Sequence, residues 1–166
     1  MSTVRMTLNG KALKAEVAAR TSLADFLREQ LNLTATHLAC EHGVCGACTV
    51  LLQGEPVRGC LTLAIACEGA DVRTFEGLRD DEVMAALVRS FHEHHGLQCG
   101  FCTPGMLVTA RDLILRGKAT TEHEIRIGLA GNLCRCTGYT SIVESIARAA
   151  EALQAKTGHE VRGAAG

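Results

Sequence analysis

The sequence contains no tryptophan, one tyrosine and four phenylalanines in 166 residues. A nucleotide or sugar site built on aromatic stacking is therefore not expected. No apolar run approaches the length of a membrane span, and no charged segment followed by an apolar one opens the chain. The formal net charge is −1, which argues against the basic face that a nucleic-acid partner requires. We expect a cytoplasmic protein with no membrane span and no nucleic-acid partner.

Cysteine, by contrast, is abundant, with nine residues in the chain. Thiols stay reduced in the cytoplasm, so these cysteines are expected to act as ligands rather than to form disulfides. The hydrophobic content of 47% and the length allow one or two small domains, each with its own core.

Two short, glycine-flanked turns in the second half each carry a cysteine pair. Cys99 and Cys102 are separated by two residues, and Cys134 and Cys136 by one. Four thiolates can close around one metal centre and select zinc or an iron–sulfur cluster. The single residue between Cys134 and Cys136 fits a zinc knuckle poorly, since zinc sites usually use paired C-x2-C turns. Two unrelated pairs of buried cysteines are the remaining alternative.

A second set lies in the first half, at Cys40, Cys45 and Cys48, with Cys60 twelve positions further on. The spacing C-x4-C-x2-C…C is the plant-type ferredoxin signature for a [2Fe-2S] cluster. Gly43 and Gly46 allow positive φ, which turns backbone N–H groups towards the cluster sulfurs. Zinc is the alternative ligand for this set.

Four histidines and the ninth cysteine could also bind a metal, but each is interpreted as a structural residue. His42 could replace a cysteine, as in Rieske centres, but four cysteines are already available, so a solvent-facing residue is expected. Cys67 ends an apolar run and is expected to be a core side chain. His92, His94 and His95 are interpreted as the last turn of a helix that Gly96 ends, rather than as metal ligands.

Apolar periodicity predicts an α+β protein of two domains. Residues 4–8 and 11–17 alternate as strands around an Asn9-Gly10 hairpin turn, and Thr21 or Ser22 caps a following helix. Residues 49–52 are predicted to be extended. Four helices are expected after the polar stretch 74–81, which places the domain boundary between 1–76 and 77–166. A shorter helix is expected over residues 122–129. Each of the other three has one apolar stripe: Val83, Leu87 and Phe91 in the first; Leu107, Leu113 and Ile114 in the second; and Ile142, Ile146, Ala149 and Leu153 in the third.

Together these motifs resemble the iron–sulfur subunit of the molybdenum hydroxylases, the family of xanthine dehydrogenase, aldehyde oxidoreductase and carbon monoxide dehydrogenase. The resemblance rests on the first cysteine set at Cys40–Cys60 and on the two cysteine pairs within Gln98–Met106 and Gly131–Tyr139. It covers about residues 4–153. It implies an N-terminal β-grasp, plant-ferredoxin-like domain followed by a four-helix bundle. Each domain would hold one [2Fe-2S] cluster.

The resemblance also implies partners and roles. The chain would relay electrons from a molybdopterin centre on a large subunit, through the Cys99/Cys102/Cys134/Cys136 cluster and then the Cys40/Cys45/Cys48/Cys60 cluster, to a flavin or another acceptor. Gln98 and Cys136 would touch the pterin. A medium FAD subunit and a dimer of heterotrimers are expected, with no catalytic residue and no substrate site on this chain.

Two other functions remain open from the sequence. A free-standing ferredoxin would account for residues 1–74 but leaves the second cysteine set unexplained. A zinc-stabilised scaffold or thiol sensor would be colourless. If the relay holds, the cluster of the helical domain is expected to be less solvent-accessible than the cluster at Cys40–Cys48.

Overall fold

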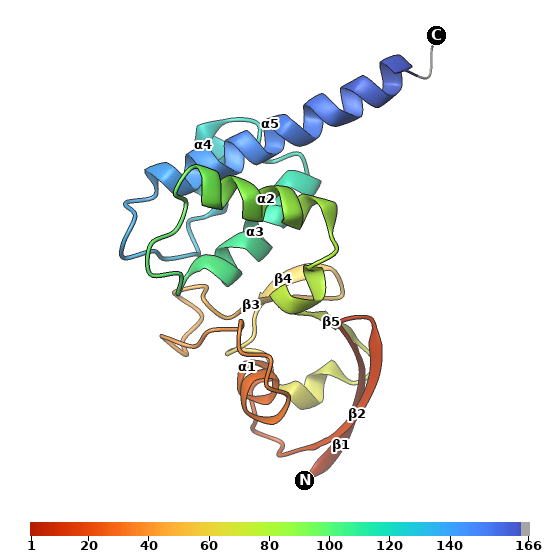
Figure 1. Cartoon of the computed structure of the whole chain (residues 1–166). Coiled ribbons are helices and arrows are strands. Elements are labelled where there is room, and N and C mark those ends of the chain that lie inside the picture. Colours follow the sequence, from red (N-terminus) through yellow and green to blue (C-terminus); the bar gives the residue numbers. More distant parts are fainter. Residues whose placement is uncertain (164–166) are drawn as a thin grey trace.

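The computed structural model describes the backbone of residues 1–163 and the side chains of residues 1–156. The chain forms two parts that lie one above the other in Figure 1, a sheet domain from the first half and a helical domain from the second. The predicted α+β architecture is confirmed.

The N-terminal part is a mixed five-stranded sheet. Its strands are β1 (Ser2–Leu8), β2 (Lys11–Val17), β3 (Thr49–Leu52), β4 (Glu55–Arg58) and β5 (Asp71–Arg73). They are arranged in the order β2-β1-β5-β3-β4, with β1 parallel to β5 and the other neighbours antiparallel. One helical segment, α1 (Leu23–Asp25) continued by the π-helical turn η1 (Phe26–Gln30), packs on this sheet through a shared core. This is the β-grasp arrangement that the resemblance implies.

The local features predicted for the N-terminal domain follow from turn and cap chemistry. Asn9 and Gly10 both have positive φ, at 50° and 79°, as a two-residue hairpin turn requires. The Ser22 hydroxyl accepts a hydrogen bond from the Asp25 N–H at 3.1 Å, so Ser22 rather than Thr21 is the N-cap.

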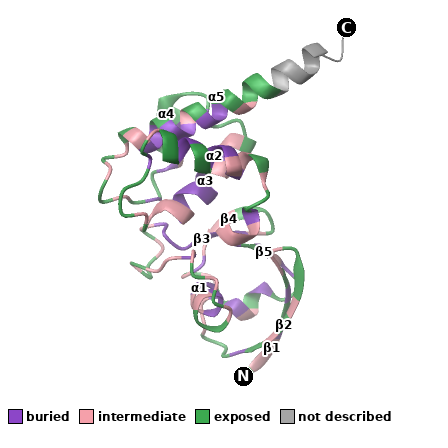
Figure 2. Ribbon diagram, in the orientation of Figure 1, coloured by how far each residue is buried: buried purple, intermediate pink, exposed green. Residues whose placement is uncertain are grey.

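The C-terminal part contains four helices. They are α2 (Glu82–Glu93), α3 (Thr103–Leu115), α4 (Glu122–Gly128) and α5 (Thr140–Gly163). Helix α2 packs against α3 and α5, and α4 packs against the same two helices. The buried residues of α5 belong to the part beside α2 and α4, and the helix becomes exposed where it runs out beyond them (Figure 2). Thr121 and Glu124 form a capping box at the start of α4.

Two short 3-10 turns, η2 (Ala64–Cys67) and η3 (Phe75–Leu78), lie before and after β5. Each part of the chain has its own apolar core. The two cores are nevertheless in contact, because α3 packs on β3 and β4, and Leu51 of β3 is buried in the helical core. The division at residues 76 and 77 stays a prediction. Within the described residues, no helix is both apolar enough and long enough to cross a membrane.

The end of α2 differs from the prediction in its detail. The chain leaves the helix through His95, whose φ is +56°, and the Gly96 N–H then donates to the Phe91 carbonyl at 2.8 Å. Gly96 is required for space instead, since a Cβ there would lie 2.6 Å from the Ser145 hydroxyl and 2.9 Å from the Phe91 ring. The sequence pattern placed the end of the helix correctly to within a few residues: α2 ends at Glu93 with His94 as its C-cap, and the left-handed residue is His95.

Candidate metal centres

The first cysteine set lies in the irregular loop between η1 and β3, with Cys60 just after β4. Gly43 and Gly46 have φ of +74° and +73°, the conformation expected of them from the sequence. Within this loop the backbone N–H groups of His42 and Cys45 both point at the Cys40 sulfur, each at 3.4 Å. The loop therefore offers hydrogen-bond donors to sulfur, as iron–sulfur loops do.

Hydrogen bonding and burial separate the thiols of this loop. The N–H groups of Cys45 and His42 lower the pKa of Cys40 to about 6, because they stabilise its thiolate. Burial raises the pKa of Cys48 to about 11. Binding a metal centre at Cys48 near neutral pH would therefore release a proton from that thiol, whereas Cys40 is already suited to bind as a thiolate.

The second set comes from two loops of the helical domain. Cys99 and Cys102 lie between α2 and α3, and Cys102 is the N-cap residue of α3. Cys134 and Cys136 lie between α4 and α5. The loops meet so that the sulfurs of Cys99 and Cys136 are 3.4 Å apart. Burial raises the pKa of Cys102 to about 12.

The loop that carries Cys134 is held by its own polar groups. Burial tends to raise the pKa of Cys134, but the Thr137 hydroxyl, 3.2 Å from its sulfur, helps to lower that pKa overall. The Cys134 N–H donates to the Tyr139 hydroxyl at 2.9 Å, and Tyr139 itself has a positive φ of 70°. Two side chains that follow the cysteines in sequence thus fold the loop back on itself.

The eight thiols interact in pairs. Cys40 interacts with Cys45 and Cys48 with Cys60 in the first set, and Cys99 with Cys136 and Cys102 with Cys134 in the second. Among the described side chains, no three His, Cys, Asp or Glu residues converge on a position for a single metal ion. A [2Fe-2S] cluster does not require such a position, because each of its two irons takes two protein ligands. The chemistry and pairing of the donors therefore fit two such clusters.

Exposure of the two sets is the reverse of the expectation for the chain on its own. Cys99 and Cys136 are exposed and the other two of the second set are half-buried, whereas Cys48 is buried and no cysteine of the first set is fully exposed. The second set is the more exposed one in the chain alone because it lies in loops at one end of the bundle, not between its helices, and the order expected for the assembled complex stays a prediction. Gln98 is also exposed, directly beside Cys99.

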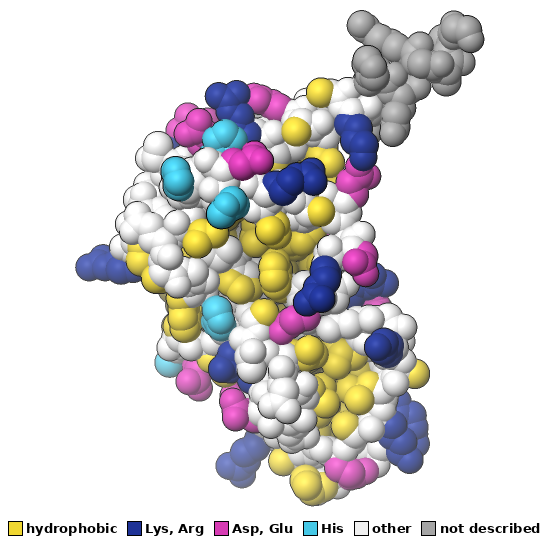
Figure 3. Space-filling model, in the orientation of Figure 1, with side chains coloured by type: hydrophobic (Ala, Val, Ile, Leu, Met, Phe, Trp, Pro, Cys, Tyr) yellow, Lys and Arg dark blue, Asp and Glu magenta, His cyan; other side chains and the backbone are white. Residues whose placement is uncertain are grey.

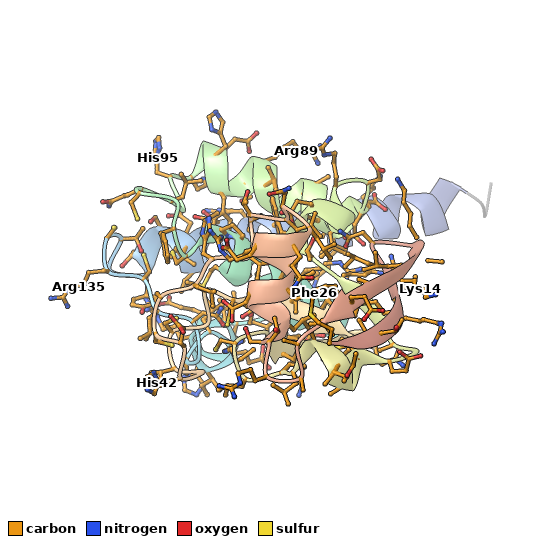
Figure 4. The ribbon with its side chains drawn as sticks, turned by 90° about the horizontal axis from the view of Figure 1, so that it is seen from below. Lys14, Phe26, His42, Arg89, His95 and Arg135 are labelled. Atoms are coloured by element: carbon orange, nitrogen blue, oxygen red, sulfur yellow. The ribbon has the colours of Figure 1, made fainter. Side chains whose placement is uncertain are left out.

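The two ligand loops touch each other. The Leu133 N–H donates to the Cys45 carbonyl at 2.8 Å, and Leu133 precedes Cys134, so one hydrogen bond joins the two cysteine sets. Figure 4 shows His42 and Arg135, one from each loop, at the same end of the molecule, away from Lys14. The Phe101 carbonyl accepts a hydrogen bond from His37 Nδ1 at 2.6 Å, and the His37 and Phe101 rings stack at 4.7 Å.

The remaining candidates take the structural roles predicted for them. Cys67 is fully buried in the N-terminal core, where its pKa is raised by burial. His42 is exposed, and its ring hydrogen-bonds the carbonyl of Cys40 rather than pointing at the sulfurs. His92 lies in the last turn of α2, His94 is its C-cap and His95 follows, and all three are outside both cysteine sets.

Sequence reasoning missed a group of polar residues between the two loops, namely Thr49, Arg58, Thr109 and Asn132. Thr49 follows Cys48 and Asn132 lies two residues before Cys134, but nothing in the spacing relates these two residues to each other or to Arg58 and Thr109. Their association arises from the packing of α3 on β3 and β4, which no local pattern encodes.

Comparison with known proteins agrees with this arrangement. The family described as "2Fe-2S iron-sulfur cluster binding domain" matches residues 6–74, and that described as "[2Fe-2S] binding domain" matches residues 74–147. The chain is 53% identical over 146 residues to the caffeine dehydrogenase subunit gamma of Pseudomonas sp. (strain CBB1), covering 86% of this chain and 87% of that one. The chain belongs to the iron–sulfur small subunits of the molybdenum hydroxylase family.

Solved structures show how this small subunit occurs among its relatives. Quinoline 2-oxidoreductase from Pseudomonas putida 86 matches with a TM-score of 0.86 and 48% identity, over 92% of this chain and 96% of that chain. Aldehyde oxidoreductase from Desulfovibrio gigas matches with a TM-score of 0.85 and 37% identity, over 94% of this chain but only 18% of that one. The same two-domain unit is thus a separate chain in one relative and a small part of a long chain in another.

The cofactors of this small subunit are two [2Fe-2S] clusters, one for each of its two cluster-binding domains. A [2Fe-2S] cluster supplies a one-electron redox centre whose potential depends on hydrogen bonds to its sulfurs, charge and exposure. The N–H groups of His42 and Cys45 and the hydroxyl of Thr137 are among the donors to cysteine sulfur that bear on those potentials.

Proposed function

We propose that this chain is the electron-relay subunit of a molybdenum-dependent hydroxylase or dehydrogenase complex. Cys99, Cys102, Cys134 and Cys136 would hold the cluster on the donor side, and Cys40, Cys45, Cys48 and Cys60 the cluster on the acceptor side. The observation that carries the proposal is the hydrogen bond from the Leu133 N–H to the Cys45 carbonyl, which brings the two ligand loops into direct contact. Electron transfer between one-electron centres becomes faster as they lie closer together, so this contact between the loops favours a relay through both clusters.

The direction of the relay is the one that the resemblance to the molybdenum hydroxylases implies, and the exposure of the second set supports it. Cys99 and Cys136 are exposed at the surface, and so is Gln98, which precedes Cys99. We infer that a molybdopterin on a large partner subunit lies against this surface and that Gln98 and Cys136 touch the pterin. The Cys40–Cys48 loop then faces the acceptor, which we infer to be FAD on a medium subunit.

Apolar side chains surround the exposed cysteines. Leu97, Phe101 and Leu133 are 39%, 44% and 49% exposed. Through His37, which stacks on Phe101, this surface continues into a groove of about 640 Å³ beneath α2, lined by Phe75, Met84, Val88 and Pro104 among others. Figure 3 shows hydrophobic side chains gathered on this part of the molecule. An exposed apolar surface of this kind is typical of a protein–protein contact.

The assembly belongs to the same proposal. The match to nearly all of one chain in quinoline 2-oxidoreductase supports a separate small subunit, and the match to 18% of the D. gigas chain supports additional parts of the complex elsewhere. We infer a dimer of heterotrimers in the cytoplasm, with the domain division between residues 76 and 77. The substrate would be bound by the molybdenum subunit, not by this chain.

Phe101→Glu is expected to detach the large subunit while both clusters remain. A charge at this half-exposed apolar position would lie in the proposed contact, and central interface residues commonly account for more than a tenfold change in affinity. Affinity purification of the tagged chain from its native host, followed by molybdenum and iron assay, measures the effect. We expect about a tenfold loss of molybdenum with unchanged iron.

Ile127→Glu is the matched control for this experiment. Ile127 is 63% exposed on α4, and the same charge there should leave the molybdenum yield unchanged. If the unmodified chain brings down no molybdenum at all, the subunit proposal fails and a free-standing electron carrier replaces it.

Exposure also predicts the order in which the clusters are lost. In the purified chain without partners, a chelator or oxidant should destroy the second cluster first, because Cys99 and Cys136 are open to solvent while Cys48 is buried. In the intact complex that cluster should become the more resistant one. Electron paramagnetic resonance of the two reduced clusters during the treatment distinguishes the two orders. The same order in both preparations would argue against a partner over this surface.

A further inference from the structure

A forked arginine spans the contact between the two ligand loops. Arg58, the last residue of β4, donates from one terminal nitrogen to the Thr49 hydroxyl and from the other to the Gly131 carbonyl, both at 2.7 Å. Thr49 directly follows Cys48, and Gly131 lies three residues before Cys134. One side chain of the sheet domain is therefore bonded next to a cysteine of each set.

A buried amide makes a second link at the same place. Asn132 Nδ2 donates to the Gly46 carbonyl at 3.2 Å, and Asn132 Oδ1 accepts from the Thr109 hydroxyl of α3 at 3.0 Å. The Gly46 carbonyl also accepts from the Thr49 hydroxyl at 2.6 Å. Asn132 is only 2% exposed, so these bonds replace the water that its amide has lost.

The backbones at this contact leave no space for further approach. A Cβ on Gly46 would lie 2.3 Å from the Gly131 carbonyl oxygen, and a Cβ on Gly105 would lie 2.4 Å from the Gly46 carbonyl oxygen. The loops cannot move closer without a clash, and they cannot move apart without breaking the bonds of Arg58 and Asn132.

We propose that Arg58 and Asn132 are positioning residues that hold the two ligand loops at one separation and so fix the distance an electron crosses between the clusters. The inference rests on the proposed relay function. Neither side chain donates to a cysteine sulfur in the structure; both act through the backbone beside the cysteines. Rigid support of this kind is what a site requires when small displacements are costly.

The link depends on the two terminal nitrogens of the Arg58 guanidinium, which donate to two different acceptors, rather than on its positive charge. A planar guanidinium can donate to two acceptors in different directions at once, whereas a lysine ammonium is a point charge on a flexible stem. Arg58→Lys should therefore fail to restore the link although it keeps the charge. A purely electrostatic influence of Arg58 on the clusters would instead be preserved by lysine.

The test uses the full chain with both clusters and the variants Arg58→Gln, Arg58→Lys and Thr49→Val. Two readouts report on the loop contact: hydrogen exchange of the Leu133 amide, followed by mass spectrometry, and the magnetic coupling between the two reduced clusters. Loss of a charge-assisted hydrogen bond should speed exchange at Leu133 by about tenfold, equivalent to about 1.4 kcal/mol. The magnetic coupling between the two reduced clusters should become weaker, or vary more from molecule to molecule, in all three variants, while the iron content stays unchanged.

Arg116→Gln is the matched control. Arg116, the C-cap residue of α3, also bridges the domains, to Glu55 of β4 at 2.6 Å, but it lies on the exposed surface outside the ligand loops. Its loss should leave Leu133 exchange and cluster coupling as they are. Unchanged readouts in Arg58→Gln and Thr49→Val, full rescue by lysine, or an equal effect of Arg116→Gln would each overturn the proposal. Failure of the relay function would show separately, as absence of molybdenum from the native complex.

Discussion

Cys102→Ala is expected to reduce the iron of the purified chain from about four atoms to about two and to remove one of two paramagnetic signals. Each [2Fe-2S] cluster takes four cysteine ligands, two on each iron, so loss of one thiol leaves an iron without its full set. Cys102 interacts with Cys134, and no ninth thiol is within reach to replace it, since Cys67 lies in the core of the other domain. Cys48→Ala should have the same effect on the other cluster.

Cys67→Ala is the control for both variants, because it also removes a buried thiol. It should keep all the iron and cost about 1 kcal/mol of unfolding free energy, as a modest truncation in a core does. Iron and zinc assays with visible spectra after anaerobic purification measure these outcomes. Loss of iron in Cys67→Ala would show that the ligand assignment is wrong, and two zinc atoms with no iron would end the cluster interpretation.

Features that depend on neighbours in sequence were predictable from the sequence. The Asn9-Gly10 turn, the helix cap at Thr21 or Ser22 and the short helix over 122–129 each depend on a few adjacent residues, and the structure contains the turn, the cap at Ser22 and the helix α4. Cysteine spacing likewise carries the ligand sets, because a loop of fixed length allows few metal geometries. These signals are local, so a single sequence is sufficient to find them.

Features produced by packing between the domains were not predictable in this way. Arg58 and Asn132 are 74 positions apart, and only the docking of α3 on β3 and β4 brings their neighbourhoods together. The left-handed residue at the end of α2 is His95, and Gly96 beside it is held against Phe91 and against Ser145 of α5, which lies 49 positions later in the sequence. The exposure of Cys99 and Cys136 depends on where the bundle places its loops, which helical periodicity does not encode.

The contact between the domains also suggests why the cluster loops are rich in glycine. Gly43 and Gly46 were expected to serve the first cluster through positive φ, and both have it. Gly46 has a second reason, since the Gly131 carbonyl and the Asn132 amide occupy the position that its side chain would take. One residue therefore shapes a ligand loop and permits the second loop to reach it.

Gly46→Ala is consequently expected to cause a large loss of stability. A left-handed conformation costs a non-glycine residue about 1–2 kcal/mol, and forcing an atom into a filled space costs about 1–3 kcal/mol more. At Gly46, φ is +73° and the added Cβ would lie 2.3 Å from the Gly131 carbonyl oxygen, a backbone atom that Arg58 holds in place. We expect a total of about 2–5 kcal/mol and a lower melting temperature, measured by thermal unfolding of the iron-loaded chain.

Gly54→Ala separates the two contributions, because Gly54 has a φ of +82° but no atom within 4 Å of an added Cβ. That variant should lose only the conformational part, about 1–2 kcal/mol, and should keep the Leu133 amide protected. Gly46→Ala should also expose that amide, since the second loop must move away to admit the methyl group. Equal destabilisation by the two variants would mean that the loops are not in contact in solution, and the short path between the cysteine sets would then be lost as well.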